Sequence, residues 1–186
     1  MEFIGSGKII KEGWPKVRNK KMYWGNTALK ISFEYEEGHI LTSKGNKVPV
    51  FKLIENSLVT ELFDITTGEA ISKPAPYYEQ FHFDLSYNCF GYCFADSLVF
   101  LPNPDLLIED DYDKTTYENA ELILFLEHKG FGNNGEEIFL YSHAVKKLPN
   151  GNVSFKPGIN KLVENVNEEQ AIHVYNFNHK IYLKRK

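Results

Sequence analysis

The chain has 186 residues, of which 42% are hydrophobic and 25% are charged. These values fit one packed domain, or one domain with a small β-module, and exclude disordered and collagen-like chains. A formal net charge of −4 excludes a protein that binds nucleic acid by neutralising its phosphates. The longest apolar run, Leu122 to Leu126, is far shorter than the ~20 residues of a membrane-spanning helix. We therefore expect neither a nucleic-acid partner nor a membrane.

The cysteine content and the first residues predict the compartment. Cys89 and Cys93 are four positions apart in a segment with helical spacing, where their Cβ atoms would lie ~5–6 Å apart. This separation exceeds the ~3.8 Å of a disulfide, so both are expected to be thiols in a reducing compartment. The N-terminus has no basic start followed by an apolar stretch. We expect a cytoplasmic protein, or one exported by a route that needs no classical signal peptide.

The first part of the chain has the pattern of a small antiparallel β-module. Apolar and polar residues alternate over 27–35, which predicts a half-buried strand, and Glu36-Glu37-Gly38 is expected to end it. Turn residues separate further expected strands at 39–43, 48–54 and 58–65. Pro74 and Pro76 favour an extended connector. We therefore predict a β-rich N-terminal module over 1–76, which would recognise the substrate or a partner protein, and a second domain over 77–186.

The second domain begins with helical spacing and continues as strands. A helix is expected over 89–100, capped by Asn88 or Ser86, and a short second helix opens at Asn103-Pro104-Asp105. Antiparallel strands are expected at 121–127, 138–147, 152–156 and 179–184. Asn150-Gly151 predicts a tight hairpin turn between the second and the third. Helices followed by an antiparallel meander indicate an α+β domain.

The segment around Cys89 is the first candidate for chemistry. If Asn88 caps the helix, Cys89 occupies the first turn, where free backbone N–H groups and the helix dipole lower a thiol pKa. Gly91 is a poor helix former, so it is expected to serve close backbone packing. A buried structural cysteine is the alternative interpretation. Cys89 is thus a candidate nucleophile on the condition that a base lies beside it.

His143 is the candidate base, and here the sequence resembles a known family. Asn88-Cys89-Phe90-Gly91-Tyr92 resembles the Asp/Asn-Cys-x-Gly-aromatic motif of the NlpC-like, papain-fold cell-wall peptidases and amidases. Ser142-His143-Ala144-Val145, followed by Asn150-Gly151, resembles their histidine hairpin. A bacterial group of that fold that carries Asn-Cys-His-Gly is closer still, since further motifs follow in its order at 109–112, 155–158 and 181–185. The resemblance covers about 81–186.

The resemblance implies a fold and an activity. It implies an α+β, papain-like core in which a Cys-bearing helix packs on an antiparallel sheet. It implies a cysteine hydrolase that cleaves an amide bond in a peptide, a peptidoglycan stem or a protein glutamine, with Cys89 as nucleophile and His143 as base. No cofactor is implied. The residues expected to line a peptide or peptidoglycan-like substrate are Tyr87, Phe90, Tyr92 and Phe155.

Two departures from the family leave the function open. Phe90 stands where the closer bacterial group has histidine. The hairpin register predicts Phe155 beside the His143 ring, where the family has a polar residue, and phenylalanine cannot hydrogen-bond an imidazole. The residues that remain to orient the ring or bind an oxyanion are Asn88, Asn152, Ser154 and Lys156. A binding or adaptor protein that has lost catalysis is the main alternative. A bacterial effector toxin of the same fold is a further one.

A metal site is not expected. Cys89 and Cys93 with His82 or His173 have a spacing that zinc tolerates, but no second paired motif accompanies them. The acidic run of Glu109, Asp110, Asp111 and Asp113 lacks the glycine and terminal glutamate of a calcium loop, so a solvated face is expected.

Overall fold

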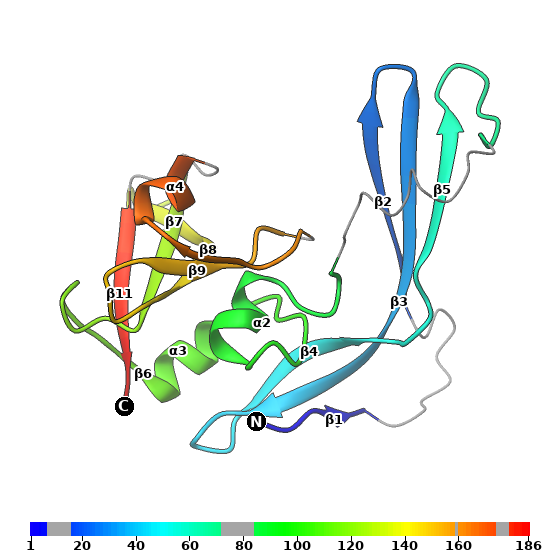
Figure 1. The fold of residues 1–186 in the computed structure, drawn as a ribbon. Helices are drawn as coiled ribbons and strands as arrows, with labels where there is room; N and C mark the ends of the chain where they lie inside the picture. Colours follow the sequence, from blue (N-terminus) through cyan, green and yellow to red (C-terminus); the bar gives the residue numbers. More distant parts are fainter. Residues whose placement is uncertain (7–15, 72–83, 159, 174–178) are drawn as a thin grey trace.

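The structure is a computed structural model that describes residues 1–6, 16–71, 84–158, 160–173 and 179–186. Within these ranges the chain forms eleven strands and three short helices, with the strands in two sheets (Figure 1). The expected α+β, papain-like core is therefore wrong, because the protein is mostly β. The predicted connector around Pro74 and Pro76, and with it the predicted domain boundary, lies outside the described residues.

The N-terminal sheet is built on one long strand, β3 (Thr27–Leu41). Four antiparallel strands pair with it: β1 (Ile4–Gly5), β2 (Lys16–Trp24), β4 (Lys47–Leu53) and β5 (Val59–Asp64). The prediction that this strand ends at Gly38 is wrong. A Cβ atom on Gly38 would lie 2.4 Å from the Phe3 ring and 2.5 Å from the Ile4 carbonyl oxygen. The glycine therefore lets β1 approach β3 and does not end the strand.

The C-terminal sheet is antiparallel and has the strand order β10-β9-β8-β7-β11-β6. Its strands are β6 (Tyr112–Lys114), β7 (Leu122–Phe131), β8 (Glu137–Lys147), β9 (Val153–Phe155), β10 (Val163–Val166) and β11 (His179–Arg185). All four strands that the sequence predicts in this part are confirmed, although β7 runs four residues beyond the expected 121–127. The hairpin turn at Asn150-Gly151 is also confirmed, since β8 pairs with β9 across it.

The helices are short: α2 (Cys89–Phe94), α3 (Asp105–Asp111) and α4 (Glu168–His173). The helix predicted over 89–100 ends at Phe94, because Asp96 and Ser97 adopt left-handed backbone angles with φ of 49° and 62°. Phe100 then forms an antiparallel bridge with Phe51 of β4. The apolar second half of the predicted helix thus connects the two sheets. Within the described ranges, no helix is long and apolar enough to cross a membrane.

The main core lies between the two sheets. Helices α2 and α3 pack between the end of β3 with β4 and one face of the C-terminal sheet, which we call the α2 face (Figure 1). This core takes residues from both predicted domains, with Ile40 and Val50 on one side and Leu124 and Ala144 on the other. A separate cluster that includes Ala171 of α4 covers the opposite side, which we call the α4 face.

Candidate functional site

Cys89 is the first residue of α2, as predicted, but its surroundings disfavour a thiolate. The Asn88 side chain accepts a hydrogen bond of 2.9 Å from the Gly91 N–H, so the predicted cap is confirmed. Only 8% of Cys89 is exposed, and burial raises the pKa of its thiol to about 11 despite the opposing backbone N–H of Ala144. The prediction of a lowered pKa is therefore wrong. At neutral pH the thiol is protonated and a poor nucleophile.

The Asn-Cys-x-Gly motif has a structural role in this chain. Asn88 donates 2.8 Å to the Leu101 carbonyl oxygen and accepts 3.1 Å from the Leu101 N–H. A Cβ atom on Gly91 would lie 2.0 Å from the Val99 carbonyl oxygen, which confirms the expected close packing. Both residues hold α2 against the segment that links the sheets. The motif that resembles a catalytic one therefore also has a sufficient explanation in packing.

His143 lies on β8 among aromatic rings. Its imidazole stacks on Phe125 with 6.2 Å between ring centroids and meets Phe155 edge-on at 5.6 Å, which confirms the predicted neighbour. Only 2% of His143 is exposed, and burial lowers its pKa to about 4. The ring is therefore neutral at physiological pH.

Cys89 and His143 lie on opposite faces of the C-terminal sheet. Cys89 packs in the cluster of Leu124 and Ala144 on the α2 face, whereas His143 contacts Phe125 and Phe155, which belong to the cluster on the α4 face. Successive side chains of a strand point to opposite faces, so Ala144 and His143 cannot face the same helix. The structure does not bring the proposed nucleophile and base together.

A β-bulge accounts for this separation. Tyr141 packs on the α2 face, and regular alternation would direct His143 to the same side. Phe125 pairs with His143 and Leu126 pairs with Tyr141, so Ser142 is an extra residue in β8. The bulge therefore turns the His143 side chain to the opposite face.

The residues expected to orient the imidazole have other partners. The Ser154 and Tyr92 hydroxyls share a hydrogen bond of 2.7 Å on the α2 face. Lys156 is fully buried, donates to the carbonyl oxygens of Asp84 and Asn160, and has its pKa lowered by burial. At the β8–β9 turn, the Asn152 side chain donates to Asn165. With Asn88 occupied at the helix cap, the structure assigns none of them to His143.

Of the residues expected to line a substrate, two form an aromatic and basic stack. The Tyr87 and Tyr92 rings stack with 6.3 Å between centroids. The Lys156 ammonium lies 4.9 Å from the Tyr87 centroid, and the Lys146 ammonium lies 4.4 Å from that of Tyr92. These contacts join α2 to the sheet. Phe155 is buried on the α4 face, which leaves Phe90 as the expected residue that reaches a surface cavity.

That cavity is a groove at the base of the β7–β8 hairpin. It has a volume of about 400 Å³ and is lined by Phe90, Pro102, Asn103, Pro104, Asp105, Leu126, Phe139, Leu140 and Tyr141. We call it the hairpin groove. Three of the lining residues, Phe90, Phe139 and Tyr141, are aromatic. Among the described residues that line the groove, Asp105 has the one charged side chain. Of the residues that line this groove, the sequence predicted only Phe90 as part of a site. The others were predicted to lie at the start of a short helix, in the loop before it or in strands of the sheet, with no binding role.

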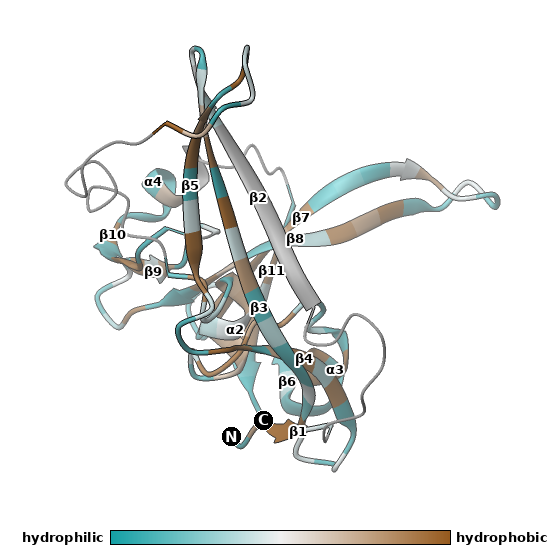
Figure 2. Ribbon diagram, turned by 90° about the vertical axis from the view of Figure 1, so that its right-hand side faces the viewer, coloured by the Kyte–Doolittle hydropathy of each residue, from teal (hydrophilic) through white to brown (hydrophobic). Residues whose placement is uncertain are grey.

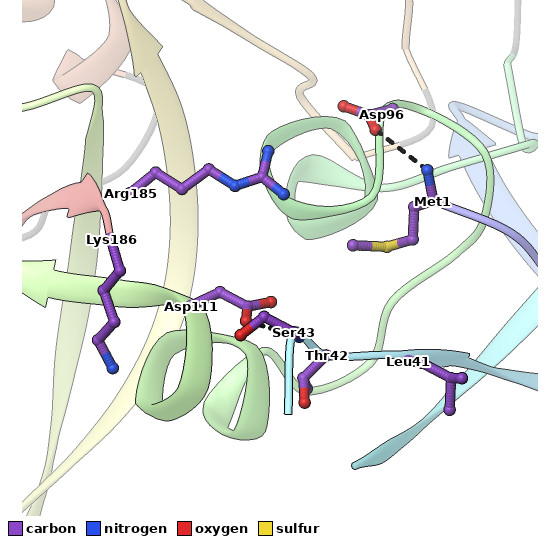
Figure 3. Close-up of a pocket in the computed structure, with 8 residues that line it drawn as sticks. All are labelled: Met1, Leu41, Thr42, Ser43, Asp96, Asp111, Arg185 and Lys186. Carbon is purple, nitrogen blue, oxygen red and sulfur yellow. Dashed lines mark hydrogen bonds and ion pairs between the residues drawn. The ribbon is translucent and has the colours of Figure 1, made fainter. Parts of the chain in front are cut away.

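A second cavity, of about 250 Å³, lies between the β3–β4 turn, α3 and the end of β11 (Figure 3). Two pairs of its polar groups contact each other: the Asp111 carboxylate accepts a hydrogen bond of 2.8 Å from the Ser43 N–H, and the Asp96 carboxylate lies 3.9 Å from the Met1 amine. Next to it, Asp110 accepts hydrogen bonds from Thr42 and Asn46. The acidic run is therefore an attachment point for the β3–β4 turn and is not simply the solvated face that the sequence indicates.

Comparisons with protein-family models, with curated proteins and with solved structures find no match to this chain. Among the described residues, no group of three or more His, Cys, Asp or Glu side chains is placed to hold a metal ion. His82, a residue of the zinc alternative, lies outside those residues.

Proposed function

We propose that this protein is a non-catalytic binding protein that holds an extended segment of a partner protein against the β7–β8 hairpin. The observation that carries the proposal is a row of aromatic side chains on the free end of this hairpin that continues into the hairpin groove. The surface belongs to the C-terminal sheet. It does not belong to residues 1–76, where the sequence analysis expected a protein partner.

The free end of the hairpin is a two-stranded ribbon. Residues 127–131 and 137–140 pair with each other, whereas the pairing of β11 with β7 in the described residues ends at Leu126. Figure 2 shows this ribbon extending away from the rest of the molecule. A two-stranded ribbon is marginally stable in water by itself. A surface of this kind is well suited to gain order and stability from a bound chain.

One side of the ribbon presents a continuous aromatic face. From the tip to the base of the ribbon, it consists of Phe131, His128, Phe139 and Tyr141. The centroid of the His128 ring lies 5.4 Å from that of Phe131 and 5.3 Å from that of Phe139. Phe131 is 68% exposed, and Leu140 on the other side is 54% exposed. Phe139 and Tyr141 also line the hairpin groove. Grouped apolar side chains on a projecting element are typical of an interaction site.

The chemistry of Cys89 supports binding over hydrolysis. A Cys–His mechanism needs a thiolate and a base within hydrogen-bond reach. Here burial raises the thiol pKa and lowers the imidazole pKa, and the two side chains face opposite sides of the sheet. Cleavage of a peptide, peptidoglycan stem or protein glutamine, whether in a housekeeping enzyme or in an effector toxin, would need β8 to rearrange.

The test combines a binding selection with an activity assay. Random 12-residue peptides displayed on phage are selected on the full chain, and the affinities of selected peptides are measured by fluorescence anisotropy. We expect Phe131→Ser and Phe139→Ser to weaken binding at least about tenfold, since each removes a large aromatic contact. Cys89→Ala is expected to bind as the wild type does, and Lys52→Ala, on the N-terminal sheet, is the matched surface control.

Two outcomes would overturn the proposal. One is a set of peptides whose binding neither hairpin substitution weakens. The other is turnover of peptidoglycan fragments or of glutamine-containing proteins by the wild type that Cys89→Ala abolishes.

A further inference from the structure

We infer that the hairpin groove holds a basic side chain, an arginine or a lysine, of the bound segment. This inference rests on the proposed function and deepens it. Three features support it: the Asp105 carboxylate at the groove, the aromatic residues that line the groove and the charge of the ribbon.

Asp105 supplies a fixed negative charge at one side of the groove. Its N–H donates 2.8 Å to the Asn103 side-chain oxygen, and its carboxylate accepts 2.9 Å from the Asn103 side-chain nitrogen. These two bonds hold the carboxylate, at the start of α3, beside Asn103, which lines the same groove. Only one carboxylate oxygen takes part, so the group keeps capacity to accept from a guanidinium or an ammonium.

The aromatic residues Phe90, Phe139 and Tyr141 line the same cavity as Asp105. Burial raises the pKa of the Tyr141 phenol, and the charge of Asp105 raises it further. An aromatic wall with a carboxylate beside it attracts cations through the ring faces and through direct charge pairing. A neutral apolar side chain would leave the carboxylate without a charged partner.

The charges of the ribbon above the groove also favour a cationic partner. The acidic residues of the ribbon are Glu127 and Glu137, and Glu136 lies in the turn at its tip. Its Lys129 ammonium lies 2.6 Å from the Glu127 carboxylate. The ribbon therefore favours a partner segment with basic residues. A volume of about 400 Å³ lies in the range of small ligand sites, which gives room for one long side chain.

The test is a nuclear magnetic resonance titration of the full chain with N-acetyl-arginine amide. N-acetyl-citrulline amide, which has nearly the same shape without the charge, is the control ligand. We expect the arginine compound to shift the backbone amides of Asn103, Leu126 and Tyr141 in a saturable way. It should bind at least about tenfold more tightly than the citrulline compound, because a charge-assisted pair is lost in the latter.

Three substitutions sharpen the result. Asp105→Asn should reduce the affinity for the arginine compound to that for citrulline. Phe139→Leu should weaken arginine binding more than it weakens binding of N-acetyl-leucine amide. Asp113→Asn removes an acidic side chain outside the groove. It should change neither the affinity for the arginine compound nor the affinity for the citrulline compound.

The outcomes separate this inference from the proposed function. Equal binding of the arginine and citrulline compounds, or an Asp105→Asn variant that binds arginine as the wild type does, would overturn the inference. If selected peptides then still bound at the groove, the proposed function would stand without it. If no peptide bound there, both would fail.

Discussion

The two ends of the β7–β8 hairpin differ although the same two strands form both. At the inner end, Leu122 to Phe125 pair with β8 and with β11, and their side chains are buried. At the outer end, Phe131, Ile138 and Leu140 are exposed, and half-buried Phe139 contacts the His179 ring of β11 at 4.6 Å between centroids. The bulge at Ser142 lies between the buried inner end and the outer end of the hairpin. One pair of strands therefore serves as the core of a sheet at one end and as a surface for a partner at the other.

The largest expected effect contrasts one phenylalanine from each end. Phe125→Ala should lower the free energy of unfolding by roughly 3–5 kcal/mol, because it empties a site that is 1% exposed. Phe131→Ala, at an exposed position of the ribbon, should change it by less than about 0.5 kcal/mol. Urea unfolding followed by circular dichroism measures both. Comparable losses would show that the ribbon belongs to the cooperative core.

The next effect is a loss of stability in acid that comes from the inner end. The pKa of His143 lies near 4 in the folded chain and near 6.5 when unfolded, so the unfolded chain binds a proton first as the pH falls. Roughly 3 kcal/mol of stability should be lost between about pH 6.5 and pH 4, and should be fully present above pH 6.5. Unfolding free energies across this range provide the measurement.

Two variants test the source of this acid effect. His143→Leu should flatten the dependence, since it keeps an apolar side chain and removes the titrating group. His128→Gln, on the exposed ribbon, should leave the dependence in place. An unchanged slope in His143→Leu would assign the effect to other groups.

The cysteines give a chemical measure of burial on the α2 face. With its pKa raised from 9.0 to about 11, Cys89 has about a hundredfold less thiolate near pH 8 than an ordinary thiol. Burial also raises the pKa of Cys93. Iodoacetamide should therefore alkylate both slowly in the native protein and rapidly in urea, as followed by intact mass. Preferential labelling of native Cys89 would instead favour the nucleophile hypothesis.

The smallest expected effect concerns the bulge itself. Deleting Ser142 leaves Tyr141 directly before His143, and regular alternation then keeps each on its present face. The cost should be within about 1 kcal/mol, near the typical effect of a single substitution. Deleting Ala144 at the inner end would shift the register of buried pairs and should prevent folding. Circular dichroism spectra and thermal melts distinguish the two deletions.

Several local features follow directly from the sequence. The alternation over 27–35, the Asn150-Gly151 turn and the Asn88 cap each depend on residues within a few positions of one another, and the structure confirms all three. The close packing at Gly91 was expected for a similar reason, because a glycine inside a helix needs a compensating contact. Local rules were sufficient for these elements.

Other features depend on contacts between segments far apart in the chain. Gly38 does not end a strand, because β1 packs against it. The helix from Cys89 stops at Phe94, since Asp96 and Ser97 turn the chain, and Phe100 then pairs with Phe51. The apolar spacing of 95–100 fits a helix and an extended bridge equally well. The α+β, papain-like core is wrong because the described residues form two antiparallel sheets with three short helices.

The sequence by itself determined where most strands lie, which turn joins β8 to β9, and that Cys89 begins a capped helix. Only the tertiary structure decided which face of the sheet each side chain occupies. One extra residue at Ser142 directs His143 away from Cys89 and leaves Tyr141 at the hairpin groove. The side-chain period of a strand is two, so a single bulge reverses every later orientation, and no local pattern marks where that bulge forms.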